Sequence, residues 1–266
     1  MPPPAADAPC PEQAFNATAL KWHTCAWLLL PVLVFLTGWM HWYAALPLTL
    51  LTAAGLTPRE SKEPQTRDSL PAFPLFTRSS FLALAAFAAL MALSGWGEWV
   101  NQHPDHIVRN ACLRELVASP WPVIFPDGNV LIYNTGFWLV PALAGKLAGL
   151  DAARVLVVLW GTWGLFLSWL WLCVFSGRRS LLLALLMAAF GSLLNVQCWL
   201  GLDLFRLHYF GTAEQIMCSA NASIPVLLFF IFLASGRMPL YWMPILFAAT
   251  AFYSPLAALG LSLIHI

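Results

Sequence analysis

The segment AARVLVVLWGTWGLFLSWLWLCVFSG, residues 152–177, decides the fold of this 266-residue chain. Its single charged residue, Arg154, lies near its start, and most of the other residues are apolar. A helix needs about 20 mostly apolar residues to cross a hydrocarbon core roughly 30 Å thick. The segment is therefore predicted to be a transmembrane helix.

The rest of the chain has the same character. The sequence is 60% hydrophobic and 9% charged, whereas soluble domains are about 25% charged. Further long apolar runs cover residues 80–97, 180–202 and 239 onward. We therefore expect an all-α, polytopic membrane protein whose surroundings are the lipid bilayer. The net charge of +1 gives no indication of a nucleic-acid partner.

The two ends of the sequence differ from its middle. Residues 1–24 are rich in proline and lack the positive charges of a signal peptide, so they are predicted to be a disordered tail. Residues 25–260 are predicted to form one transmembrane helical domain. The last six residues, 261–266, resemble a translated adapter from a sequencing library and are expected to be an artefact at the end of a truncated protein. The alternative is a genuine helical C-terminus.

Charge predicts how the helices are oriented. Residues 27–56 are too long for one span and short for two, which favours a helical hairpin that turns near residues 39–42. The following linker contains Arg59, Lys62, Arg67 and Arg78, and the positive-inside rule places it in the cytoplasm. The span 80–97 then leads to an outer loop, residues 98–130. A second polar connection is expected at residues 203–223.

One segment disturbs this order. If residues 131–150 cross the membrane, Arg178 and Arg179 lie outside, against the positive-inside rule. The alternative is that residues 131–150, which include Asn134, Gly136 and Pro141, lie partly along the membrane surface. The sequence leaves both arrangements open.

The outer loop holds a third of all acidic residues in the chain. Pro104 suits the first turn of a helix, and Asp105 and Arg109 have the i, i+4 spacing of a helical ion pair. These features predict an amphipathic juxtamembrane helix. Its apolar side is expected to carry Ile107, Val108, Ala111 and Cys112, and its polar side Asp105, His106, Arg109, Asn110 and Arg114. The alternative is a solvated loop whose charges keep it out of lipid.

The order of several short motifs resembles the first outer loop of GT-C-fold glycosyltransferases, in particular the uncharacterised bacterial multispan proteins of that kind. An acidic residue soon after an early span precedes a juxtamembrane helix, a WPV motif and a Tyr-Asn segment with Pro and Gly-Lys. The later motifs GLD (201–203), NASIP (221–225) and SPLAALG (254–260) are also similar. The matching residues of the loop region are Asp105, Asn110, Ala111, Leu113, Leu116, Trp121, Pro122, Val123, Tyr133, Pro141, Ala142, Gly145 and Lys146.

The resemblance implies a GT-C-like fold in the bacterial inner membrane and transfer of a sugar from a polyprenyl-phosphate donor at the extracytoplasmic face. It implies that Asp105 is the general base, because deprotonating an acceptor hydroxyl needs a positioned carboxylate. A departing phosphate needs cationic or hydrogen-bonding groups. The substrate-binding candidates are Arg109, Asn110, Arg114, Tyr133, Lys146 and Asp203.

Two of these candidates have a competing interpretation. Lys146 lies on the opposite side of the membrane from the loop if residues 131–150 form a full span. Asp203 follows an apolar run, where an ionisable residue is a functional candidate; the alternative is an interfacial carboxylate beside Arg206.

No metal or cofactor is predicted, although a divalent metal is an alternative. The family loop often has a paired acidic motif, whereas here His106 follows Asp105. His103, Asp105 and His106 have a spacing that suits a metal ion, but the sequence offers no obvious further ligand.

Two other function classes remain open. A transporter or flippase of lipid-linked substrates usually has ionisable residues at mid-membrane and repeated halves, while this chain concentrates its charges in a loop and shows no repeat. A non-catalytic membrane protein that retains the fold is the second alternative.

Overall fold

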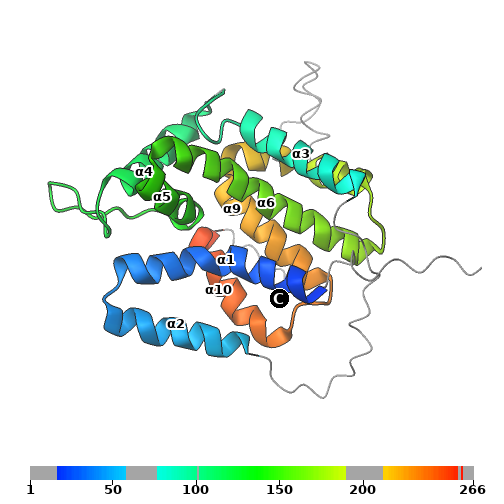
Figure 1. Cartoon of the computed structure of the whole chain (residues 1–266), viewed down its shortest axis with the longest axis horizontal. Coiled ribbons are helices and arrows are strands. Elements are labelled where there is room, and N and C mark those ends of the chain that lie inside the picture. Colours follow the sequence, from blue (N-terminus) through cyan, green and yellow to red (C-terminus); the bar gives the residue numbers. More distant parts are fainter. Residues whose placement is uncertain (1–16, 58–76, 101, 190–211, 257–258, 260–266) are drawn as a thin grey trace, which may run out of the picture.

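The computed structural model describes residues 17–57, 77–100, 102–189, 212–256 and 259. This part of the chain is helical apart from turns and one isolated bridge between Ile124 and Val130. Its helices, labelled in Figure 1, are α1 (Ala17–Trp39), α2 (Trp42–Leu56), α3 (Arg78–Leu93), α4 (Pro104–Ala118), α5 (Gly136–Ala148), α6 (Leu150–Ser176), α7 (Leu181–Ala189), α9 (Thr212–Ala234), η3 (Leu240–Trp242) and α10 (Met243–Tyr253).

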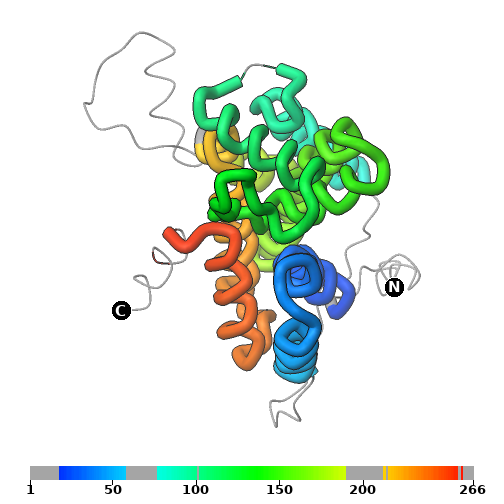
Figure 2. Tube along the Cα trace, turned by 90° about the vertical axis from the view of Figure 1, so that its left-hand side faces the viewer, coloured from blue at the N-terminus to red at the C-terminus, as the bar shows by residue number. Residues whose placement is uncertain are grey.

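Helix α6 is the centre of the bundle. It packs against α1, α3, α5 and α9, and at 27 residues it is about 40 Å long. Gly164 permits the close approach of two neighbours, since a Cβ atom there would lie 2.6 Å from Ile224 and 2.7 Å from Trp27. Viewed from the side in Figure 2, the α1–α2 hairpin and α10 lie side by side next to the group that contains α5 and α6.

The helices have the character of a membrane protein. In the described ranges, three are long and apolar enough to cross a bilayer: Thr18–Trp39 of α1, Leu150–Ser176 and Gln215–Ala234 of α9. Large apolar side chains such as Trp42, Leu82 and Leu182 are exposed. Composition and helix length together indicate a helical membrane protein, as predicted.

The hairpin is present, with α1 and α2 separated by a turn at residues 40–41. The predicted tail needs a correction at its boundary, because α1 begins at Ala17 and residues 17–24 are helical. Leu20 and Thr24 are buried, and Thr24 Oγ1 accepts a hydrogen bond of 2.8 Å from Trp171 Nε1. The remainder of the tail, residues 1–16, and residues 261–266 lie outside the described part.

Three other boundaries also differ from those expected. The span at 80–97 is the shorter helix α3, which ends at Leu93 and is followed by a turn. The second polar connection, 203–223, is already helical from Thr212, the first residue of α9. The final apolar run contains α10, which ends at Tyr253.

The bundle has two chemically different ends. We call the end that carries α4, residues 119–135 and α5 the loop end; it lies on the left of Figure 1. We call the opposite end, with Arg78, Arg178, Arg179 and Arg237, the arginine end. The acidic residues with described side chains all lie at the loop end: Glu98, Asp105, Glu115, Asp127 and Asp151.

Helix α5 begins and finishes at the loop end. A Cβ atom on Gly136, its first residue, would lie 3.0 Å from Phe252 near the end of α10. Near its last turn, Lys146 Nζ donates to the carbonyl of Ser119, just after α4. At 13 residues α5 is about 20 Å long, too short for an ordinary span. Both ends of α5 therefore lie at the loop end, and Arg179 lies beside the first turn of α3 at the arginine end.

Candidate functional site at the loop end

The turn between α3 and α4 is anchored on α9. Gly95 and Gly97 adopt φ values of 91° and 98°, a region that favours glycine. Between them, the buried indole of Trp96 donates from Nε1 to the carbonyl oxygen of Ile216 at 2.8 Å. The start of α4 is thereby fixed against the first turns of α9.

The first turn of α4 is closed by two histidines. Pro104 occupies the first helical turn, as predicted, and His103 Nδ1 accepts from the backbone N–H of Asp105 at 3.3 Å. His106 Nδ1 accepts in return from the N–H of His103 at 3.3 Å. Its Nε2 therefore carries the proton and donates to the carbonyl of Met217 at 2.8 Å. Burial lowers the pKa of His106, which favours this neutral form.

Arg109 is the buried cation of the site. Its side chain is only 10% exposed, and its guanidinium lies 5.7 Å from the centre of the Trp96 ring. Nη2 donates to Ser219 Oγ at 3.1 Å and lies 3.8 Å from Asp105 Oδ2. The Nε and Nη1 atoms are buried and have no hydrogen-bond partner among the residues that the structure describes.

Ser219 is positioned by a kink in α9. Its backbone angles, φ −150° and ψ 47°, are not helical. The hydroxyl of Ser223 donates to the Ser219 carbonyl at 2.9 Å and lies 3.3 Å from that of Gln215, eight residues earlier. Pro225, six residues after the kink, lacks the N–H that would continue the helical pattern. The kink thus turns a hydroxyl toward α4 in the midst of an apolar helix.

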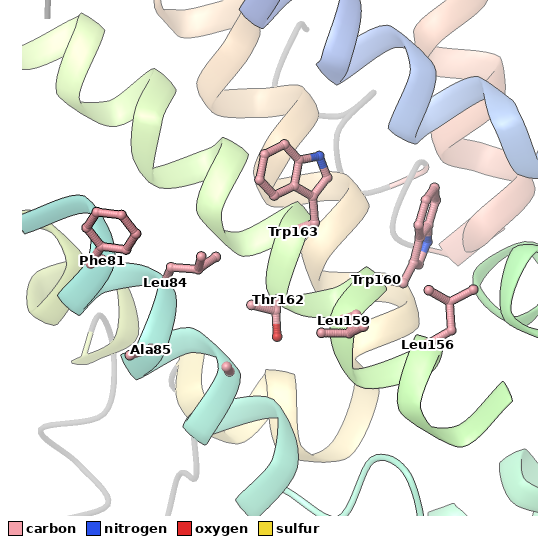
Figure 3. A pocket seen from close by; sticks show the side chains of 9 residues that line it. Phe81, Leu84, Ala85, Leu156, Leu159, Trp160, Thr162 and Trp163 are labelled. Atoms are coloured by element: carbon pink, nitrogen blue, oxygen red, sulfur yellow. The ribbon is translucent and has the colours of Figure 1, made fainter. Parts of the chain in front are cut away.

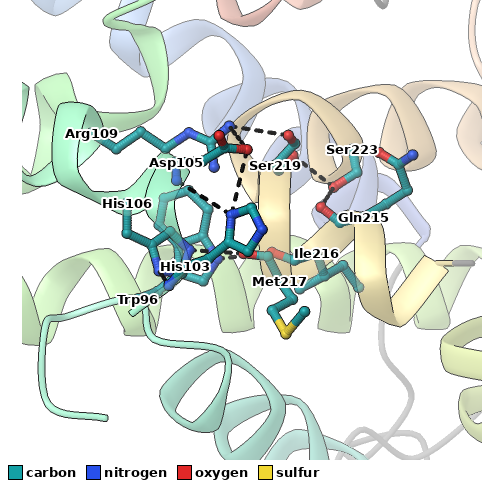
Figure 4. Close-up of polar contacts among 10 residues, drawn as sticks. All are labelled: Trp96, His103, Asp105, His106, Arg109, Gln215, Ile216, Met217, Ser219 and Ser223. Carbon is teal, nitrogen blue, oxygen red and sulfur yellow. Dashed lines mark hydrogen bonds and ion pairs between the residues drawn. The ribbon is translucent and has the colours of Figure 1, made fainter. Parts of the chain in front are cut away.

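Asp105 is the residue near Arg109 whose carboxylate is accessible to solvent and to a substrate. Its side chain is 54% exposed, and its carboxylate lies between Arg109 and His103, whose Nδ1 is 3.6 Å away. Figure 4 shows the resulting chain of polar contacts from His103 through Asp105 and Arg109 to Ser219. A half-exposed carboxylate held beside a buried guanidinium is suited to accept a proton or to orient a bound hydroxyl.

A second charged cluster lies beside it. Glu98 has a side chain only 10% exposed, and its Oε2 binds both Arg114 and Arg154. Arg154 also donates to Asp151 at 2.8 Å. Glu98 has a φ of 68°, so the chain accepts a conformation unfavourable for this residue where the carboxylate meets both arginines. Arg114, predicted to bind substrate, is therefore engaged with Glu98, although its side chain remains 53% exposed.

The other predicted site residues are spread over the loop end. Lys146 lies at the same end of the bundle as α4 and not at the opposite end, where a full span of residues 131–150 would place it. Its ammonium is 5.0 Å from the centre of the Trp121 ring. Asn110 donates to Gln102 Oε1 at 2.7 Å. Tyr133 is 38% exposed and packs 5.7 Å from Trp138. These three do not contact Asp105, and Asp203 lies outside the described residues.

The predicted faces of α4 require a correction. The residues buried against the bundle include His106 and Arg109, which were expected on the polar side of the helix. Ile107 and Val108, expected on the apolar side with Cys112, are 70% and 58% exposed, whereas Cys112 is buried. The reason is that α9 offers a carbonyl and a hydroxyl at its kink, so polar side chains of α4 find partners inside. The exposed apolar pair then faces outward, where lipid is a suitable neighbour.

Both histidines at the start of α4 make hydrogen bonds within the protein. Both ring nitrogens of His106 are used in hydrogen bonds within the protein. In the ranges that the structure describes, no group of three or more His, Cys, Asp and Glu side chains is placed to hold a metal. The alternative of a divalent metal on His103, Asp105 and His106 stays a prediction.

Several residues of the site were not assigned a role from the sequence. Trp96 and Ser219 hold Arg109, and Arg154 completes the Glu98 cluster. The two glycines that flank Trp96 are a visible turn signal. The partners themselves are not visible, because Arg109 and Ser219 are 110 residues apart.

Comparison with known proteins gives no further assignment: no family model, no curated protein and no solved structure matches the chain.

Proposed function

We propose that this chain is a membrane glycosyltransferase of the type its sequence resembles. It transfers a sugar from a polyprenyl-phosphate donor to an acceptor hydroxyl at the extracytoplasmic face of the bacterial inner membrane. The observation that carries the proposal is the pairing of a half-exposed carboxylate, Asp105, with the buried guanidinium of Arg109 at one end of an apolar bundle.

The two residues supply complementary functions. Asp105 takes the proton of the acceptor hydroxyl while the acceptor oxygen bonds to the sugar carbon and the bond from that carbon to the phosphate oxygen breaks. The polyprenyl phosphate leaves as an anion, which positive charge stabilises. Arg109 supplies this charge from beneath the carboxylate, and the exposed part of Arg114 lies on the same helix.

Charge supports the proposed orientation. The arginine end, with Arg78, Arg178, Arg179 and Arg237, corresponds to the cytoplasmic side under the positive-inside rule. The loop end, with the acidic residues, then faces outward. In this multi-pass arrangement α5 rests at the outer surface, and Asp105 lies close to the headgroups, where the phosphate of a lipid-linked donor resides.

The test is donor turnover in membrane vesicles from cells that express the protein, so that native acceptors are present. A panel of radiolabelled polyprenyl-phosphate hexoses is added from the outer side, and release of polyprenyl phosphate is measured. The proposal predicts release from at least one donor above vesicles that lack the protein. Equal release in both sets of vesicles for every donor would contradict it.

A further inference from the structure

A groove lies on the outside of the bundle between α3 and α6. It has a volume of about 650 Å³, within the range of ligand pockets. Figure 3 shows Phe81 and Leu84 on one side and the indole rings of Trp160 and Trp163 on the other. The small side chains of Ala85 and Ala88 leave space between them.

The groove offers almost no polar partner. Its one hydroxyl, on Thr162, donates to the carbonyl of Val158 in its own helix at 2.7 Å. The ring of Trp160 stacks on Trp27 at 5.2 Å and forms a fixed wall. A ligand that fills this groove must therefore be a hydrocarbon, because a polar ligand would lose its hydrogen bonds to water without replacement.

The membrane-spanning character of α6 indicates which hydrocarbon is available to the groove. Helix α6 has the length and composition of a membrane span, so the groove along its middle faces the hydrocarbon core of the bilayer. The occupant is then a lipid chain.

Charge at one end of the groove indicates the headgroup. Phe81 lies next to Ser80, whose hydroxyl accepts from Arg179 Nη1 at 3.3 Å. Arg78 begins the same helix and is exposed, as is Arg178. Each basic residue near a membrane surface attracts anionic lipid by about 1 kcal/mol. Three arginines at this end favour a phosphate that carries an uncompensated negative charge.

We propose that the groove between α3 and α6 binds one acyl chain of an anionic phospholipid, whose phosphate lies at Arg78, Arg178 and Arg179. The lipid would be held from the inner leaflet, on the opposite side from Asp105. The proposal depends on the membrane placement of α6 and is independent of glycosyl transfer.

The first experiment is native mass spectrometry of the purified full chain after equilibration with equal amounts of dioleoyl phosphatidylglycerol and dioleoyl phosphatidylcholine. The wild type is expected to retain one phosphatidylglycerol in preference to phosphatidylcholine. Replacing Arg178 and Arg179 with Gln should lower this preference by about fivefold for each arginine. Equal retention of the two lipids by the wild type would overturn the proposal.

The groove itself is tested by filling it. Ala85→Trp and Ala88→Trp place an indole in the space for the chain and should abolish preferential retention. Ala86→Trp and Ala89→Trp add the same side chain to the same helix, at exposed or nearly exposed positions outside the groove, and should leave retention unchanged. If the groove variants and the control variants lose preferential retention equally, a lipid bound at this groove is contradicted. The same holds if neither pair loses it.

A second measurement needs no substitution in the groove. Phosphatidylglycerol with a diazirine in one acyl chain is reconstituted with the wild type and activated by light. The expected crosslinks fall in residues 81–88 and 156–163, above the level found at exposed Leu46 and Leu50 of α2. Uniform labelling of all lipid-facing helices would overturn the proposal. It would also be overturned if added undecaprenyl phosphate displaced the crosslinks while added unlabelled phosphatidylglycerol did not.

Discussion

Arg109 Nη2 donates a hydrogen bond to Ser219 Oγ at 3.1 Å, which joins helix α4 to the kink of α9. The two residues are 110 positions apart in the chain, and both face inward. Their contact fixes the guanidinium that lies behind Asp105. It is the link through which the fold of the bundle positions the proposed site.

Ser219→Ala should destabilise the protein by about 1–3 kcal/mol, because it removes the only hydrogen-bond acceptor that the described part of the chain offers to the largely buried guanidinium of Arg109. The measurement is thermal unfolding in detergent. Ser235→Ala, just after the end of α9, is the control, since its hydroxyl donates to the carbonyl of Phe232 and accepts from the backbone N–H of Arg237, so both of its partners are backbone groups within three residues of it. Equal melting temperatures for the two variants would argue against a structural role of the Arg109–Ser219 contact.

His106 predicts how stability depends on pH. Burial lowers its folded-state pKa below the ordinary value of 6.5, so the unfolded chain binds a proton more readily than the folded one. The resulting stability is complete above pH 6.5 and is lost progressively as the pH falls below it. Unfolding curves at pH 5 and pH 7.5 should therefore diverge for the wild type and lie closer together for His106→Gln.

The control for this prediction is His41→Gln, on the exposed turn between α1 and α2. It should keep the pH dependence of the wild type. If His106→Gln also keeps it, protonation of His106 does not contribute to stability in this range.

The Glu98 cluster predicts an order of effects among three substitutions. Glu98→Gln removes the carboxylate that two arginines share and should destabilise the protein by about 1–3 kcal/mol. Arg154→Gln should lower stability more than Arg114→Gln, because an ion pair contributes less as it becomes more exposed to solvent. The Arg154 side chain is 23% exposed and that of Arg114 is 53% exposed. Thermal unfolding measures all three. A larger loss for Arg114→Gln would show that the cluster is not organised around α6.

The proposed orientation predicts which sites are labelled from outside intact cells. In a background without native cysteines, single cysteines are placed at Asp127, at Leu147, which is 86% exposed, and at Arg178. A membrane-impermeant maleimide should label the first two positions from the outside and the third only after the membrane is opened. Labelling of Leu147 and Arg178 from the same side would contradict the placement of α5.

Much of the fold follows from the sequence. Apolar runs predict the main helices, because long apolar segments have few alternatives to a helix in lipid. The break at residues 40–41 and the start of α4 at Pro104 were also predictable, from run length and from proline. The charges of Arg178 and Arg179 indicated that residues 131–150 need not cross, and the contact of Lys146 with Ser119 explains how α5 stays at the loop end.

The site was less predictable, for a physical reason. Periodicity shows which residues share a face of α4 but not what that face meets. The inward orientation of Arg109 depends on the kink at Ser219, and that of Glu98 on Arg154, 56 residues away. The spacing predicts Asp105 and Arg109 as a pair, whereas the partner of Arg109 on α9, Ser219, required the structure.

The most direct test of the proposed catalytic role is the turnover rate of Asp105→Asn in the vesicle assay with polyprenyl-phosphate hexoses. Asp127→Asn is the matched control, because this exposed carboxylate lies at the loop tip and accepts hydrogen bonds from Asn129. A general base contributes about 10²–10⁴-fold to rate, so Asp105→Asn should lower turnover by at least about a hundredfold while Asp127→Asn retains it. Turnover by Asp105→Asn at the rate of the wild type would contradict the account.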